Sequence, residues 1–99
     1  MTKQEAMKLE TRCDKIMSGY LGRSCTVSMA LTGKLKVMFN DGDYITMKRV
    51  YDEPDYISYT GDYDDLKEKI ANVIECLSDN KDVFDQLMWS YDHRRELED

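Results

Sequence analysis

The spacing of the hydrophobic residues changes twice along the chain, and this change constrains the fold more than any other feature. Over residues 6–20 they recur at steps of three or four, which is typical of one face of an amphipathic helix. Over residues 25–51 they alternate with polar residues, as in half-buried β-strands. Over residues 66–91 the helical spacing returns. The pattern therefore predicts a helix, a set of strands and two further helices.

The bounds of the first helix follow from residues that favour helix ends. Thr2 and Glu5 have the spacing of a capping box, in which each side chain bonds to a backbone N–H group near the start of the helix. Gly19 and Gly22 are the two candidates for its end, since glycine readily adopts the left-handed conformation that closes many helices. The sequence predicts a helix that begins at about Thr2 and ends at one of these glycines.

Turn residues divide the alternating region into strands. Residues 25–31 and 34–39 predict two strands joined by a tight reversal at Thr32-Gly33. Residues 40–43, Asn-Asp-Gly-Asp, predict a second turn because Asn, Asp and Gly tolerate positive φ. A third strand is expected from Tyr44 to about Tyr51. The three strands form a meander.

The region after the third strand is less regular. We expect Glu53-Pro54-Asp55 to break the sheet, and residues 56–60 to form a short fourth strand at a sheet edge, where a preceding proline is harmless. Residues 60–62 supply capping chemistry for a second helix, which ends at residues 78–80. Asp79 or Asn80 is expected to cap a third helix, followed by a frayed tail to residue 99.

These elements fit one small domain that spans residues 1–99. The predicted fold class is α+β, in the order α-β-β-β-(β)-α-α, with an antiparallel meander sheet and the helices packed on one of its faces. Large aromatic side chains are usually buried, so Trp89 on the third helix is expected in the core rather than at an interface. Cys13, Cys25 and Cys76 lie on apolar positions and are expected to be reduced core thiols.

Composition excludes several classes of protein. The chain has no long apolar run and no apolar stretch near its start, which argues against a membrane span or a signal peptide. We expect a cytoplasmic protein, in the host cell if the protein is viral. The one histidine, His93, stands beside Arg94 and Arg95, where the three complement the negative end of a helix better than they serve catalysis. We therefore expect no enzyme activity and no cofactor.

Metal and nucleic-acid sites are also unsupported by motif. Residues 62–65 lack the spacing of a calcium loop, so no metal site is predicted, with weak divalent binding as the alternative. A basic outer sheet face would gather Tyr44 with three lysines, Lys34, Lys36 and Lys48. The sequence pI of about 4.7 opposes nucleic-acid binding there, and such lysines commonly protect sheet edges. No direct nucleic-acid binding is expected.

Acidic residues are concentrated in the second half of the chain. Residues 1–50 carry a net charge of +4, whereas residues 51–99 carry −10. The run from Tyr51 to Leu66 holds six carboxylates and four tyrosines and has no basic residue. Tyrosine is enriched in interfaces. The sequence therefore predicts a partner-binding surface made of Tyr51, Asp52, Glu53, Asp55, Tyr56, Tyr59, Asp62, Tyr63, Asp64 and Asp65.

Two explanations of these acids remain open. Alternate side chains of an extended segment lie about 6.7 Å apart, so a row of carboxylates would have a pitch similar to that of nucleic-acid phosphates. Acids at a helix N-terminus instead stabilise the helix by about 0.3–1 kcal/mol each, which accounts for Asp62 to Asp65. That second explanation does not account for Asp52, Glu53 and Asp55. The functional hypothesis depends most on these three.

The function predicted from the sequence is a small acidic binding or inhibitor protein. Its partner would be a positively charged protein, such as a nuclease or another nucleic-acid-binding protein, whose groove it blocks by charge mimicry. A short chain with this order of elements and no catalytic motif resembles small phage-encoded anti-defence proteins, including acidic anti-CRISPR inhibitors. The alternative is a self-associating assembly module or homodimer that uses an apolar patch of Met29, Met38, Met47 and Trp89.

Overall fold

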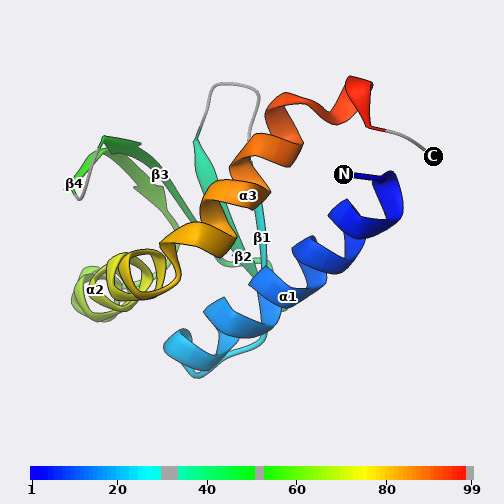
Figure 1. Ribbon diagram of the computed structural model, residues 1–99. Coiled ribbons are helices and arrows are strands. Elements are labelled where there is room, and N and C mark those ends of the chain that lie inside the picture. Colours follow the sequence, from blue (N-terminus) through cyan, green and yellow to red (C-terminus); the bar gives the residue numbers. More distant parts are fainter. Residues whose placement is uncertain (30–33, 51–52, 98–99) are drawn as a thin grey trace.

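The protein is built from a four-stranded antiparallel sheet with helices on one face (Figure 1). The computed structural model describes residues 1–29, 34–50 and 53–97. The elements are α1 (Lys3–Leu21), β1 (Cys25–Met29), β2 (Leu35–Phe39), β3 (Tyr44–Val50), β4 (Glu53–Tyr59), α2 (Tyr63–Asp79), α3 (Lys81–Asp92) and the 3-10 helix η1 (Arg94–Glu96). This order confirms the predicted α+β fold, including its fourth strand.

The ends of α1 have the predicted chemistry. The Thr2 side chain accepts a hydrogen bond from the Glu5 N–H group at 3.1 Å. The helix continues through Gly19 and ends before Gly22, whose φ of 67° is the left-handed conformation that glycine adopts most easily. The face that α1 turns to the protein interior is lined by Ala6, Leu9, Cys13 and Met17.

The strands pair in sequence order, β1-β2-β3-β4. Val27 pairs with Val37, and Val37 pairs with Ile45, so alternate residues of neighbouring strands share one face of the sheet. That inner face faces the helices. It consists of the buried residues Cys25, Val27, Leu35, Val37, Phe39, Ile45 and Met47. The predicted Thr32-Gly33 reversal lies outside the described residues.

The prediction that Glu53-Pro54-Asp55 breaks the sheet is wrong, because all three residues belong to β4. Lys48 and Arg49 are consecutive on β3, but their partners on β4, Tyr56 and Pro54, are separated by one residue. Asp55 is therefore the additional residue of a β-bulge. A proline is tolerated here because β4 is an edge strand, where one side needs no ladder hydrogen bonds.

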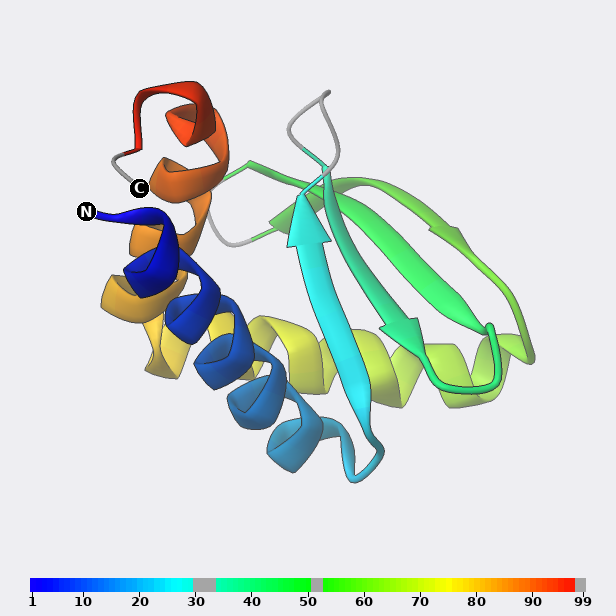
Figure 2. The same cartoon turned by 90° about the vertical axis from the view of Figure 1, so that its right-hand side faces the viewer.

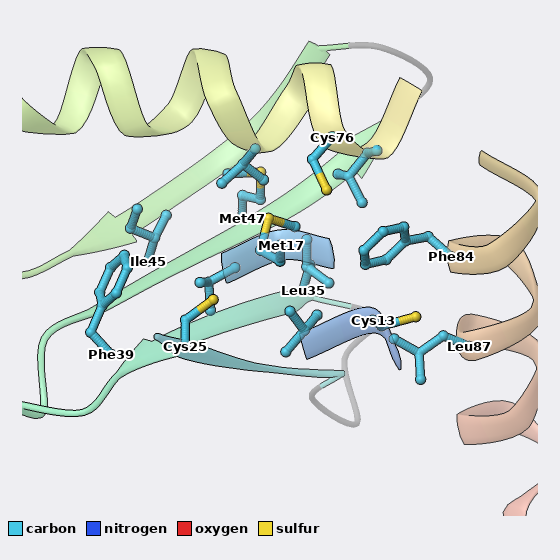
Figure 3. Packing of buried hydrophobic residues seen from close by; sticks show 14 of the residues in the cluster. Cys13, Met17, Cys25, Leu35, Phe39, Ile45, Met47, Cys76, Phe84 and Leu87 are labelled. Carbon is cyan, nitrogen blue, oxygen red and sulfur yellow. The ribbon is translucent and has the colours of Figure 1, made fainter. Parts of the chain in front are cut away.

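Helices α2 and α3 complete the core on the inner face. From α2 the core takes Leu66, Val73, Cys76 and Leu77, and from α3 it takes Phe84 and Leu87. All three cysteines are free and buried in this packing, as predicted (Figure 3). Burial raises the pKa of Cys13 to about 11 and that of Cys76 to about 12, so these thiols stay protonated and unreactive at neutral pH.

At the junction of α2 and α3 the predicted position of the cap is confirmed, but its hydrogen bonding differs from the prediction. Asn80 occupies the first capping position of α3, but its side chain donates a hydrogen bond to the Cys76 carbonyl at 3.0 Å. The Asp79 carboxylate accepts a hydrogen bond from the Tyr20 hydroxyl at 2.8 Å. Asn80 therefore closes the end of α2, and Asp79 ties α2 to α1.

The C-terminal segment is folded onto α1, so the expectation of a frayed tail is wrong as far as residue 97. Arg94 forms an ion pair with Glu10, and its guanidinium lies 4.3 Å from the centre of the Tyr91 ring. Leu97 is buried. These contacts place η1 beside the N-terminal half of α1 (Figure 2).

The expectation that Trp89 belongs to the core is also wrong. Its side chain is 46% exposed on α3, and its ring stacks on the His93 ring with their centres 4.2 Å apart. The predicted apolar patch does not form either, because Met47 is buried in the core whereas Met38 lies on the opposite face of the sheet. The side chain of Met29 is outside the described part.

Candidate functional site

The predicted partner-binding residues follow one another along an edge of the molecule. Tyr51 and Asp52 lie outside the described residues. Glu53, Asp55 and Tyr56 are placed by their backbone in β4, Tyr59 ends that strand, and Tyr63 begins α2. Asp62, Asp64 and Asp65 are exposed around the start of α2. We call residues 53–65 the acidic edge, since this range holds five carboxylates and no basic residue.

The two edges of the sheet differ in their contacts with α1. At the β1 edge, Asp14 of α1 accepts a hydrogen bond from the Val27 N–H group at 2.7 Å, and the Ser18 hydroxyl accepts one from the Cys25 N–H group at 3.0 Å. Side chains of α1 thus satisfy outward backbone donors of β1. Strand β4 forms the other edge, on the side of the sheet away from α1 (Figure 2).

Hydrogen bonding at the end of β4 fixes which of its backbone groups face β3. The Thr60 N–H group donates to the Tyr44 carbonyl at 3.1 Å. Because hydrogen-bonded and non-hydrogen-bonded pairs alternate in an antiparallel ladder, Ser58 also bonds to β3, whereas Ile57 and Tyr59 do not. The N–H and C=O groups of Ile57 and Tyr59 are therefore directed away from β3, along the outer edge of the sheet.

The same two residues leave apolar surface exposed at this edge. Ile57 pairs with Met47 and Tyr59 pairs with Ile45, so all four lie on the inner face. Met47 and Ile45 are 1% and 2% exposed, but Ile57 and Tyr59 are 37% and 38% exposed. The inner face is thus covered less completely at β4 than at β3. Sequence alternation predicted the strand, but not this incomplete cover.

The link from β4 to α2 presents carboxylates at the end of the sheet. Gly61, at φ 98°, reverses the chain in a conformation that L residues seldom adopt. Asp62 then caps α2 by accepting a hydrogen bond from the Asp64 N–H group at 3.3 Å. The predicted capping role is therefore confirmed for Asp62. Asp64 and Asp65 stand exposed in the first turn, where they also complement the helix dipole.

One further acid, Asp43, lies at this end and was missed as a site residue. The Thr60 hydroxyl donates to an Asp43 carboxylate oxygen at 3.0 Å, so the turn between β2 and β3 lies against the link. Asp41 accepts a hydrogen bond from the Asp43 N–H group, which lowers the Asp41 pKa, and pairs with Arg23 at 2.6 Å. Turn chemistry is a sufficient explanation of both acids in the sequence, and only the fold brings Asp43 beside Thr60.

The outer sheet face has the opposite charge. Lys36, Tyr44 and Lys48 are brought onto this face by the strand register, and the Lys36 ammonium lies 5.5 Å from the centre of the Tyr44 ring. The described side chains of this face include no carboxylate; they are Thr26, Ser28, Lys36, Met38, Tyr44, Thr46, Lys48 and Ser58. The charge asymmetry of the sequence is thus also an asymmetry in space.

The His93 ring nitrogen Nδ1 lies 2.8 Å from the Trp89 carbonyl, which holds the imidazole at the end of α3. Within residues 1–29, 34–50 and 53–97, no three His, Cys, Asp or Glu side chains are grouped so that they could hold a metal ion. Within the same ranges no helix combines the length and apolar character that a membrane span requires.

Compared with protein-family models, with curated proteins and with solved structures, the chain matches none of them.

Proposed function

We propose that this protein is a small non-enzymatic inhibitor that docks its acidic edge onto a positively charged protein partner, such as a nuclease or another protein that handles nucleic acid. The observation that carries the proposal is the position of the acids. By their backbone positions, the five acidic residues of the acidic edge follow one another from the edge strand β4 into the exposed first turn of α2, without a basic residue among them.

Charge mimicry explains how such an edge would inhibit. Proteins that bind nucleic acid present lysine and arginine along a groove, and their affinity comes largely from neutralising phosphates. Carboxylates spaced along a strand and a helix start offer a comparable series of negative charges. Opposite fields would make the association fast and sensitive to salt. This is the mode of action that the resemblance to phage-encoded anti-defence proteins also implies.

Structural roles account for part of the acidic edge, and the proposal must be weighed against them. Asp62 caps α2, and a proline and a bulge at Asp55 are common means of protecting an edge strand from aggregation. Neither role requires Ile57 and Tyr59 to be exposed beside the acids. Apolar and aromatic surface next to a series of charges favours an interface over a merely solubilising surface.

Three variants that change the net charge equally test the proposal. One neutralises the strand acids, by Asp52→Asn, Glu53→Gln and Asp55→Asn. A second neutralises the helix-start acids, by Asp62→Asn, Asp64→Asn and Asp65→Asn, and asparagine at position 62 keeps the cap. The control carries Asp82→Asn, Asp85→Asn and Asp92→Asn in α3. That helix follows the C-terminal end of α2, about 25 Å along the helix axis from Asp62.

Binding is measured by capture of proteins from a nuclease-treated host extract, followed by elution with a DNA duplex. We expect captured basic proteins that the duplex displaces. Both acidic-edge variants should lose this capture, while the α3 control and the thermal midpoints stay nearly unchanged. Capture that resists the duplex, or that falls equally in the α3 control, would contradict charge mimicry at the acidic edge.

A further inference from the structure

The acidic edge has, besides its charge, the backbone groups needed to bind an extended chain. The N–H and C=O groups of Ile57 and Tyr59 are directed away from β3. At the opposite edge, Asp14 and Ser18 of α1 bond to the corresponding N–H groups of β1. The fold therefore closes one edge of the sheet with side chains and leaves the other edge oriented for a further strand.

We propose that β4 accepts an extended basic segment of the partner as a fifth strand of the sheet. Proteins commonly bind peptides by such strand addition, in which main-chain hydrogen bonds supply affinity and alternate side chains supply specificity. This inference rests on the proposed function only for the charge of the partner. The pairing itself follows from the strand register and the exposed edge.

Apolar contacts limit where the added strand would lie. Ile57 and Tyr59 are more than a third exposed on the inner face, beside the buried pair Met47 and Ile45. A strand hydrogen-bonded to β4 would place its own inner-facing side chains next to Ile57 and Tyr59 and so extend the core by one strand. The bulge at Asp55 interrupts regular pairing, which restricts the segment to residues 56–60.

Charge identifies the occupant as basic and argues against a second copy of this chain. Acids stand at both ends of the available segment, with Glu53 and Asp55 before it and Asp62, Asp64 and Asp65 after it. If two copies paired antiparallel about Ser58, the acids that precede the segment in one copy would lie next to the acids that follow it in the other. Like charges facing each other across strands are destabilising. A lysine- or arginine-rich strand would instead meet carboxylates at each end.

The probe is an acetylated and amidated peptide of alternating lysine and valine. Its binding is followed by fluorescence anisotropy, and amide hydrogen exchange is followed residue by residue by NMR. We expect saturating peptide to slow exchange of the Ile57 and Tyr59 amides by about tenfold or more, because these N–H groups gain acceptors. The Ser58 amide, which already bonds to β3, should change little.

Two control peptides separate backbone pairing from charge alone. The same peptide with N-methyl groups on its valines keeps the charge, but it lacks the N–H groups that would face β4 and its methyl groups obstruct the pairing. A glutamate–valine peptide keeps the backbone but reverses the charge. We expect neither to protect Ile57 and Tyr59. Failure of the lysine–valine peptide to bind, binding without slowed exchange at these two amides, or equal protection by the N-methylated peptide would overturn the proposal.

Substitutions give a second measurement. Ile57→Lys with Tyr59→Lys should weaken peptide binding by about tenfold, since the added charges repel the basic strand. Thr26→Lys with Ser28→Lys adds the same charge to β1 at the other end of the sheet and should leave the affinity nearly unchanged. Equal weakening by both pairs would show that net charge, not strand addition at β4, governs binding.

Failure of this inference can be told apart from failure of the proposed function. If basic partners are captured and lost with the acidic-edge variants, but Ile57 and Tyr59 stay unprotected, the charge proposal holds and strand addition is wrong. If the peptide protects both amides but no DNA-displaceable partner is captured, the edge binds basic strands and the inhibitory function is wrong.

Discussion

Individual polar side chains satisfy backbone groups at the edge of the sheet, and the hydrophobic pattern of the sequence does not reveal this role. Asp14 and Ser18 lie one turn apart on α1, and each bonds to an N–H group at the edge of β1. The helical period identified the buried face of α1 from residues such as Cys13 and Met17. It could not show that the polar neighbours of these residues would meet a strand edge, because that depends on how the helix crosses the sheet.

The Asp14 contact predicts opposite outcomes for two substitutions. Asp14→Ala removes the acceptor of the part-buried Val27 N–H group and should lower the free energy of unfolding by about 1–3 kcal/mol. Asp14→Asn keeps an oxygen acceptor at the same position and should cost clearly less. Chemical denaturation of both variants at neutral pH makes the comparison. Equal losses would mean that the carboxylate charge, not the acceptor, stabilises this edge.

The pH dependence of the same pair follows from the Asp14 pKa, which burial raises above its ordinary value of 3.8. The folded protein therefore binds the Asp14 proton more tightly than the unfolded chain does. This stabilising contribution is present at pH below 3.8 and is lost as the pH rises through the folded-state pKa. We expect the stability of the native protein relative to Asp14→Asn to fall across that interval and to stay constant above it.

At the scale of elements, the sequence correctly predicted the features that depend on neighbouring residues in the chain. Alternation defined the strands, turn residues placed the β2–β3 reversal, and the Thr2–Glu5 spacing placed the start of α1. The errors arose where tertiary contacts decide instead. The sequence predicts a sheet break at residues 53–55, whereas these residues extend β4 through a bulge. It also predicts Trp89 in the core, whereas α3 packs through Phe84 and Leu87.

The candidate site was only partly predictable for the same reason. The sequence identified the acids and tyrosines of the acidic edge, because their density is a local property. It did not identify Ile57 as part of this surface, since an apolar residue on a strand is ordinarily buried. Asp43 was also missed, because its contact with Thr60 joins two turns far apart in the sequence. The exposure of side chains at a sheet edge depends on how far the helices cover the sheet, and composition does not predict this.

The end of α1 offers a matched pair of glycine substitutions at this scale. Gly19 lies inside the helix, and a Cβ atom there meets nothing within 4 Å, so Gly19→Ala should raise the free energy of unfolding by about 0.5–1 kcal/mol. Gly22 has a φ of 67°, so Gly22→Ala should lower it by about 1–2 kcal/mol. Thermal and chemical unfolding measure both. Shifts of the same sign would contradict the assigned helix end.

At the scale of the whole molecule, the two charged surfaces and the dispersed apolar residues bear on self-association. Met38 and Trp89 are exposed on different elements, one on the outer sheet face and one on α3, while Met47 is buried. They do not provide the single apolar patch that the assembly alternative requires. Charge offers another route to self-association, since the lysines of the outer face are complementary to the acidic edge.

This arrangement predicts a monomer with a weak, salt-dependent association through charge. The net charge of −6 repels copies from one another, and few charges are available for an attractive contact between Lys36 or Lys48 and the acidic edge. Sedimentation velocity at high micromolar concentration should give a monomer at physiological salt. A weak mass increase at low salt should vanish in the Lys36→Gln, Lys48→Gln variant. A dimer that persists at high salt and in this variant would instead require an apolar interface, and the assembly alternative would then replace the inhibitor proposal.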